Sequence, residues 1–249
     1  MEKLVSIITP CYNSQDFLLE TYQSIINQTY QDWEWIVVDD NSSDNSRKIL
    51  REFKDNRIKI FFNKENKGAA FSRNKALKEA SGRYITFIDS DDIWEAIFLE
   101  ETINYLSTNS EELVYSSYKR VDENLNKILD DFIAIDKVDF KRILFNCPIP
   151  MLTSVYDSSR IGKVFFPDVE LREDHAMWIE LLRKIKYARA INKPLGIYRI
   201  RQNSVSRDKF LIGIAQYKLY KKYLKLNTII SCYYSFCWAI NGLRKYGKL

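Results

Sequence analysis

The residues best suited to chemistry are acidic clusters that follow two strand-like runs of the sequence. Asp39-Asp40 ends the apolar run Ile36–Val38, and Asp89-Ser90-Asp91-Asp92 ends the run Tyr84–Ile88. Carboxylates placed together repel one another unless a cation or a donor-rich ligand lies among them. One acidic turn is equally explained as the cap of a following helix. Two such turns in equivalent places favour a site for a hard divalent cation.

A third carboxylate, Asp174, lies at the start of a predicted helix with an apolar stripe. It is a candidate general base, although first-turn acids are also favoured by the helix dipole, and spacing alone supports both readings. His175, the only histidine of the chain, is its neighbour in sequence. Adjacent helical positions do not face each other, so we expect His175 to have an auxiliary or structural role rather than to form a relay with Asp174.

The first hundred residues alternate between strand-like and helix-like segments, which predicts a parallel sheet with crossover helices. The expected strands are Leu4–Thr9, Glu34–Val38, Ile58–Phe62 and Tyr84–Ile88, and the expected helices lie around Phe17–Asn27, Asp44–Phe53 and Ala69–Ala80. We expect Ser42 and Ser43 to cap the second helix and Gly68 to open the third. Ligands of such sheets bind beyond the carboxyl ends of the strands, so Thr9–Asn13 and the two acidic turns should outline one pocket.

The second half reads as mixed α+β. It contains an expected helix at Trp94–Asn109, strands at Leu113–Val121, Lys127–Ile135 and Leu195–Ile200, a helix at Glu173–Lys184, and two C-terminal helices. We therefore expect a domain over residues 1–207, with a nucleotide-binding half at 1–109 and an acceptor-binding half at 110–207, followed by a helical tail at 208–249.

Composition indicates an ordered globular chain, with 46% hydrophobic residues and only 7 glycines and 5 prolines among 249 residues. The four cysteines show no paired C-x-x-C spacing, and no signal peptide precedes the first strand-like run. A reducing, cytoplasmic location is therefore expected.

Charge is distributed unevenly along the chain. Residues 1–183 carry 23 basic and 32 acidic side chains, whereas residues 184–249 carry 15 basic side chains and one acid, Asp208. Within residues 184–249, the segment Leu226–Leu243 is uncharged, rich in aromatics and too polar to span a membrane. This pattern favours a helix lying in the headgroup layer. A helix packed on the domain or on another subunit is an equal alternative. Nucleic-acid binding is disfavoured because the aromatics are not interleaved with the cations.

Five ordered motifs resemble the inverting family 2 glycosyltransferases with the A-type nucleotide-sugar-binding fold, over about residues 4–207. The motifs are Val5–Asn13, Ile36–Asp44, Asn66–Gly68 with Ser72–Asn74, Phe87–Asp92, and Glu173-Asp174 with Tyr198–Ser206. The resemblance implies an α/β fold with a Rossmann-like nucleotide-binding half and a mixed central sheet. It also implies sugar transfer from a nucleotide diphosphate, with UDP favoured, to a hydroxyl of a saccharide or lipid-linked saccharide in surface-polymer synthesis.

The same resemblance assigns roles to individual residues. Pro10, Tyr12 and Asp40 are expected to contact the nucleoside base, and Arg73 to help hold the nucleotide. Asp89 and Asp91 form the D-x-D motif around Ser90, which joins the donor-binding set. Asp91 is expected to bind Mn²⁺ or Mg²⁺ directly, Asp89 to reach the ribose or the metal shell, and Asp174 to act as the base.

The sequence departs from the family pattern at Arg201, where many members carry histidine. A guanidinium pairs well with phosphate oxygens, so we expect Arg201 to contact the diphosphate, the alternative being a solvated loop cation. Two rival functions fit the sequence less well. A nucleotidyltransferase usually has a Gly-rich phosphate loop after its first strand, and Pro10–Gln15 contains none. A non-catalytic sugar-nucleotide-binding protein would not need Asp174.

Overall fold

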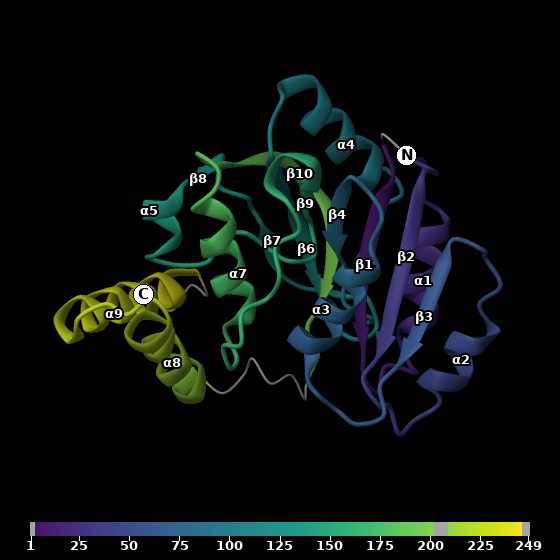
Figure 1. The fold of residues 1–249 in the computed structure, drawn as a ribbon, viewed down its shortest axis with the longest axis horizontal. Coiled ribbons are helices and arrows are strands. Elements are labelled where there is room, and N and C mark those ends of the chain that lie inside the picture. Colours follow the sequence, from purple (N-terminus) through teal and green to yellow (C-terminus); the bar gives the residue numbers. More distant parts are fainter. Residues whose placement is uncertain (1–2, 202–208, 246–249) are drawn as a thin grey trace.

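The computed structural model describes residues 3–201 and 209–245, and within them a ten-stranded sheet runs through the molecule (Figure 1). The strand order is β3-β2-β1-β4-β9-β6-β10-β5, with β7 beside β6 and β8 beside β10. The strands are β1 (Val5–Cys11), β2 (Trp33–Asp39), β3 (Ile58–Phe62), β4 (Tyr84–Phe87), β5 (Ile93–Trp94), β6 (Leu113–Val121), β7 (Lys127–Phe132), β8 (Lys137–Val138), β9 (Ser154–Asp157) and β10 (Ala188–Arg199). The helices are α1 (Leu18–Ile26), α2 (Ser46–Glu52), α3 (Ala69–Glu79), α4 (Phe98–Asn109), α5 (Phe140–Ile143), α6 (Ser158–Ile161), α7 (Glu173–Leu182), α8 (Lys209–Lys218), the π-helical turn η2 (Leu219–Tyr223) and α9 (Thr228–Lys245).

The first four strands pair in parallel, as the alternating pattern predicted. Parallel strands covered by helices on both faces are largely apolar, and every residue of β2 is buried, including Glu34 and Asp39. Gly68 precedes α3 with a φ of 87°, a conformation that a residue without Cβ adopts at little cost. The carboxyl ends of β1, β2 and β4 therefore meet at one edge of the sheet.

Helices cover both faces of the sheet (Figure 1). On one face, a buried cluster includes Leu18 of α1, Leu50 of α2 and Ile103 of α4. On the other face, a second cluster includes Leu77 of α3 and Trp178 of α7. The sheet is continuous across the two predicted halves because β9 pairs in antiparallel fashion with both β4 and β6.

Several predicted elements of the second half were wrong in detail. The expected helix at Trp94 is strand β5, whose Trp94 is buried and donates from Nε1 to the Leu152 carbonyl at 2.7 Å, and helix α4 begins at Phe98. The strand expected at Leu195–Ile200 is the end of the longer β10, which is irregular around Pro194. Strands β8 and β9 were not predicted.

The prediction that Ser42 and Ser43 cap the second helix was also wrong. Helix α2 begins at Ser46 after Asn45. The Ser42 hydroxyl instead accepts the Asn13 N–H at 3.0 Å, which joins the loops after β2 and β1. These serines hydrogen-bond between the loops that outline the pocket and do not cap the helix.

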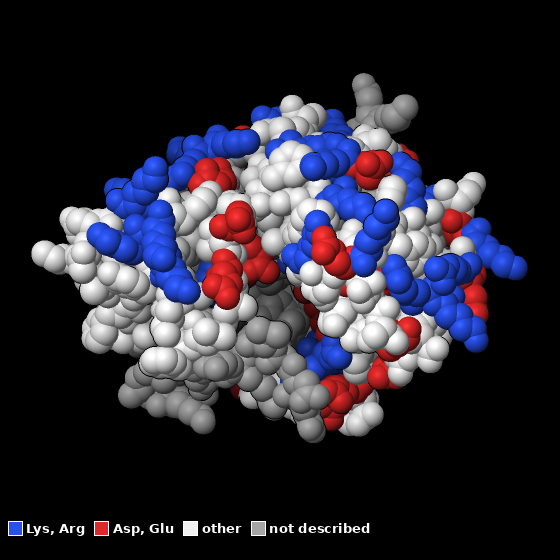
Figure 2. All heavy atoms as spheres, turned by 60° about the horizontal axis from the view of Figure 1, so that its bottom comes forward, with Lys and Arg blue, Asp and Glu red and all other residues white. Residues whose placement is uncertain are grey.

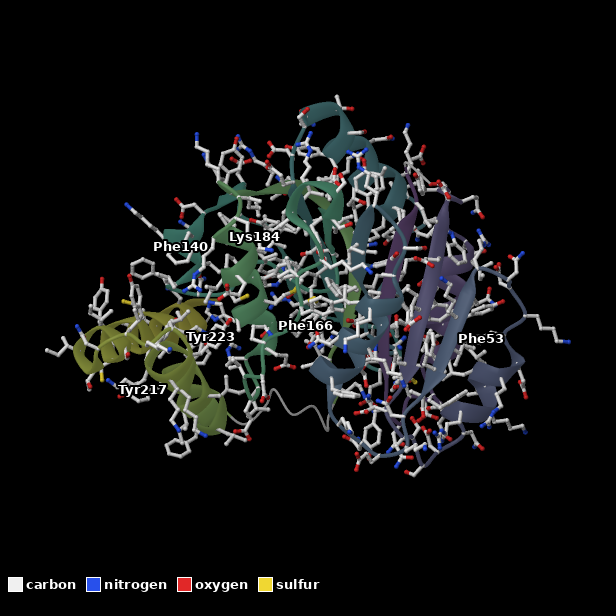
Figure 3. All side chains as sticks on the ribbon, viewed as in Figure 1. Phe53, Phe140, Phe166, Lys184, Tyr217 and Tyr223 are labelled. Carbon is white, nitrogen blue, oxygen red and sulfur yellow. The ribbon has the colours of Figure 1, made fainter. Side chains whose placement is uncertain are left out.

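The C-terminal helices lie beside α7 (Figures 1 and 3). Tyr220 donates its hydroxyl to the Leu144 carbonyl at 2.6 Å, and Tyr223 donates to Glu180 of α7 at 2.8 Å. Among the residues described, no helix combines the length and apolar character needed to cross a membrane. The domain boundary expected at residue 207 and the motif positions Gln202–Ser206 lie outside the described residues.

Candidate active site

The loops after β1, β2 and β4 are tied to one another by hydrogen bonds. The Asp40 N–H donates to the Cys11 carbonyl at 2.8 Å, and the hydroxyls of Ser14 and Ser90 lie 2.7 Å apart. Asn13 and Asn41 adopt positive φ angles of 47° and 65°, which asparagine tolerates better than most residues. The structure thus brings the three predicted strand ends together at one edge.

The Asp40 carboxylate organises the next loop of this edge. It is buried and accepts the Lys67 N–H at 3.0 Å, the Gly68 N–H at 2.7 Å and the Asn63 side-chain amide at 2.8 Å. These contacts hold the start of α3 against the end of β2. Tyr12, which was predicted to share the base-binding role, is about half exposed beside this edge, and Pro10 is partly buried.

The D-x-D turn presents two of its carboxylates to solvent and buries the third. Asp89 and Asp91 are partly exposed, whereas Asp92 is buried and accepts the Arg199 N–H at 2.9 Å. Burial and the charge of Asp89 raise the pKa of Asp91, although Arg201 opposes the shift. Burial and the neighbouring acids raise the pKa of Asp92 well above its usual range. The turn therefore concentrates negative charge that a cation would stabilise.

Arg199 supports this turn from beneath, and the sequence analysis did not single it out. Its side chain is 1% exposed, and it donates to the Asp91 carbonyl at 2.9 Å. It also pairs with Glu20 of α1 and stacks on Phe17 at 4.6 Å. Its place in the Tyr198–Ser206 motif was the only signal, because its partners lie far away in the sequence.

Arg201 lies on the open side of the same turn. Its guanidinium is 3.2 Å from the Asp91 carboxylate and 5.1 Å from the centre of the Phe17 ring, and its side chain is 33% exposed. The structure therefore joins Arg201 to the predicted metal ligand. A solvated loop cation would not need this placement.

Arg73 connects the D-x-D turn to the helix that carries the predicted base. It pairs with Asp89 at 2.6 Å and lies 3.9 Å from Glu173, while its guanidinium stacks on Phe166 at 5.4 Å. Figure 3 shows Phe166 between α3 and α7. Burial lowers the pKa of Arg73, but the charges of Asp89, Glu173 and Asp174 outweigh it and raise this pKa. Asp174 thus lies within electrostatic reach of the same guanidinium as Asp89.

His175 is a structural residue, as expected. It is fully buried and donates from Nε2 to the Ile143 carbonyl at 2.7 Å, while Nδ1 lies 3.2 Å from Arg172 and from the Gln216 amide. Burial, with the charge of Arg172, lowers the pKa of His175 to about 4. The neutral ring joins α5, α7 and α8.

The acidic turn fits a divalent metal held jointly with a substrate. Within the described part of the chain, no group of three or more acidic, histidine or cysteine side chains could hold a metal alone. Mg²⁺ commonly takes one or two carboxylates and completes its shell with phosphate oxygens and water. Asp89 and Asp91 provide two such carboxylates, and a cation would oppose the effects of burial and of the Asp89 charge that raise the pKa of Asp91.

This fold and site define a class of transferases in which an acidic turn after a Rossmann-like half binds a nucleotide sugar. Residues 6–156 match Glycosyl transferase family 2, and the chain belongs to that family. The A-type glycosyltransferase fold and the transferase class expected from the sequence are therefore confirmed.

Two curated relatives match this chain over nearly their whole length. The UDP-Glc:alpha-D-GlcNAc-diphosphoundecaprenol beta-1,3-glucosyltransferase WfgD of Escherichia coli is 38% identical over 98% of this chain and 95% of its own. The putative teichuronic acid biosynthesis glycosyltransferase TuaG of Bacillus subtilis is 34% identical over 97% of each chain. Among solved structures, S. aureus TarS 1-349 in complex with UDP-GlcNAc aligns with a TM-score of 0.72 and 21% identity, covering 91% of this chain and 69% of that one.

Proposed function

We propose that this chain is an inverting, metal-dependent transferase that moves a sugar from a UDP-sugar to a hydroxyl of a lipid-linked saccharide during surface-polysaccharide synthesis. The observation that carries the proposal is the Arg73 bridge between Asp89 of the D-x-D turn and the segment with Glu173 and Asp174. A candidate metal-binding turn and a candidate base converge on one guanidinium. The donor and acceptor classes are supported by the UDP-glucose and diphosphoundecaprenol named for the relative WfgD.

The donor would lie across the edge formed by the β1, β2 and β4 loops. Pro10, Tyr12 and Asp40 would surround the base, and Asp40 would do so while holding the start of α3 in place. Arg73 would hold Asp89 toward the ribose or the metal shell. Ser90 would fix the turn through its hydrogen bond with Ser14.

Asp89 and Asp91 would hold Mn²⁺ or Mg²⁺, which supplies Lewis-acid stabilisation of the departing diphosphate. Arg201, placed beside Asp91, would pair with a phosphate oxygen and offset the same charge. Buried Arg199 keeps the Asp91 backbone in position throughout.

Asp174 would accept the proton of the acceptor hydroxyl as that oxygen forms its bond to the anomeric carbon. The bond between this carbon and the diphosphate oxygen breaks on the opposite face, and its electron pair leaves with the diphosphate. Inversion of configuration follows from this geometry. A positioned base of this kind typically contributes about 10²–10⁴-fold in rate.

A lipid-linked acceptor would bring the enzyme to the cytoplasmic face of a membrane, where the basic C-terminal tail is suited to anionic lipid. The rival readings are weaker. A nucleotidyltransferase would place a Gly-rich loop after β1, and that loop here is Tyr12–Gln15. A non-catalytic binder would not need a carboxylate at Asp174.

The test is the configuration and rate of the transfer product. NMR of the product should give the anomeric configuration opposite to that of the donor. Asp174→Asn should lower turnover by about 10²-fold or more while UDP affinity stays the same. Glu180→Gln, on the far end of the same helix, is the matched control and should leave turnover unchanged. Retention of the donor configuration, or an active Asp174→Asn enzyme, would reject the scheme.

A further inference from the structure

One side of α9 packs against the body of the protein. The ring of Tyr234 lies 5.1 Å from that of Phe145 and 5.6 Å from that of Tyr220. Four residues further along the helix, Trp238 lies 5.5 Å beneath the Arg172 guanidinium. Because positions four apart share a helix face, this stripe fixes how the helix is rotated.

The opposite side of α9 is an apolar surface, which we call the outer face and define as Ile229, Cys232, Tyr233 and Phe236. These positions recur at three- and four-residue intervals and so form one stripe. Ile229 is 82% exposed and Phe236 is 65% exposed. Single exposed apolar side chains are common on protein surfaces, but these residues lie together in one stripe. Ile214 of α8 is also exposed. Because the packed stripe fixes the rotation of α9, the outer face is held in an exposed position.

Cations border the outer face. Phe145, whose ring lies 6.2 Å from that of Tyr233, lines a hollow together with Lys137, Lys141 and Arg142. Asp139 is the one acid in this lining, and its side chain accepts the Arg142 N–H at 2.8 Å. Figure 2 shows Lys and Arg side chains gathered beside the largely uncharged surface of the C-terminal helices.

The connection between α8 and α9 adds further positive charge, since Lys222 and Lys225 are exposed there. Lys218, at the end of α8, has an acidic neighbour, Glu170, at 3.6 Å. An apolar stripe rimmed by cations is the pattern of a helix that lies in the headgroup layer of anionic lipid.

We propose that the outer face of α9 inserts into the headgroup layer of an anionic lipid bilayer, with the cations of α5 and of the α8–α9 connection on lipid phosphates. A second copy of the chain is a poorer occupant. Pairing two outer faces would bring two sets of these cations together, and like charges across an interface oppose association. Anionic lipid offers an apolar environment to the outer face and phosphates to the cations that border it.

This contact would orient the active site as well as attach the enzyme. Trp238 of α9 lies under Arg172, which precedes the proposed base Asp174 by two residues. The docked helix therefore contacts the segment that carries the base. This part of the inference rests on the proposed function, because it concerns how a lipid-linked acceptor reaches Asp174.

The first test is flotation of the full chain with phosphatidylcholine vesicles and with vesicles containing one-third phosphatidylglycerol. We expect binding to the anionic vesicles that weakens with salt, and at least about tenfold weaker binding by I229S/F236S. The matched control is I128S/I133S, which removes exposed apolar side chains from the β7 region and should bind like the wild type. A fluorophore on the exposed Cys232 of the otherwise unchanged chain should shift to the blue on anionic vesicles.

The docking proposal is overturned if anionic vesicles do not bind the chain or shift the Cys232 probe. It is also overturned if I229S/F236S binds normally, or if sedimentation shows a dimer that this variant dissociates. A water-soluble, short-chain saccharide diphosphate serves as acceptor in a parallel assay without vesicles. Transfer there by both wild type and I229S/F236S keeps the proposed function whatever the vesicles show, whereas no transfer by either would reject that function separately.

Discussion

Replacing Arg199 with methionine should destabilise the protein and weaken donor binding together. The side chain is 1% exposed, donates to the Asp91 carbonyl at 2.9 Å and stacks on Phe17 at 4.6 Å. Methionine fills part of the volume but provides no donor. The Asp91 carbonyl would lose its hydrogen bond, and Glu20 would lose its ion-pair partner.

The expected loss of stability is about 2–4 kcal/mol. An unsatisfied buried acceptor costs about 1–3 kcal/mol, and a lost cation–π contact about 0.5–2 kcal/mol. The ion pair adds little because Glu20 is 48% exposed and regains water. For a chain of this size, the melting temperature should fall by about 5–15 °C. Loosening the residues behind a metal ligand typically costs about 10–100-fold in metal affinity.

Urea unfolding measures the loss of stability, and calorimetry with UDP and Mn²⁺ measures the loss of donor and metal affinity. Arg201→Met is the matched control, because Arg201 contacts the same aromatic ring and the same aspartate but is 33% exposed. It should change stability by less than about 1 kcal/mol. An Arg199→Met protein as stable as the wild type, with the same UDP and Mn²⁺ affinity, would refute the supporting role of Arg199.

Three further predictions concern single groups. Arg201→Ala should lower turnover by about 10–100-fold through loss of a phosphate contact, and steady-state kinetics with unchanged kcat and KM would contradict this. Since the folded-state pKa of His175 is near 4 and its unfolded value near 6.5, the stability present above pH 6.5 should fall by about 3 kcal/mol as pH drops toward 4. Denaturant melts of His175→Gln should show a flatter pH profile, and an equally steep one would exclude His175 as the cause. Burial, with the charge of Asp39, raises the pKa of the Cys11 thiol to about 12, so iodoacetamide at pH 8 should modify exposed Cys232 and spare Cys11 until the chain unfolds, as read by mass spectrometry.

The first half of the fold was predictable because its strands and helices are long enough to show periodicity. Residues 35–38 of buried strand β2 read as an apolar run, and Gly68 marks a turn that only a permissive backbone makes easily. Strands β5 and β8 have two residues each, and β9 has only Val155 and Tyr156 as apolar residues, so they carry no pattern of their own. They exist because neighbouring strands offer unpaired backbone groups, as β4 and β6 do for β9.

The candidate site was predictable where adjacent residues carry the signal and not where distant ones combine. The carboxylates of the D-x-D turn are visible in a short window of sequence. The role of Arg199 depends on Glu20 and Phe17, nearly the whole domain away. The structural contacts of Asp40 likewise depend on the backbone at Lys67 and Gly68. Single-sequence spacing contains no information about such pairs, because tertiary packing creates them.

We propose that Asp91 holds a metal between the protein and a nucleotide diphosphate. Calorimetry with UDP, GDP, CMP and dTDP, each with and without Mn²⁺, on the wild type and on Asp91→Ala tests it most directly. We expect tight binding of UDP that requires Mn²⁺ and is lost in Asp91→Ala. Binding of no nucleotide under any condition, or UDP binding that is indifferent to both Mn²⁺ and the substitution, would contradict it.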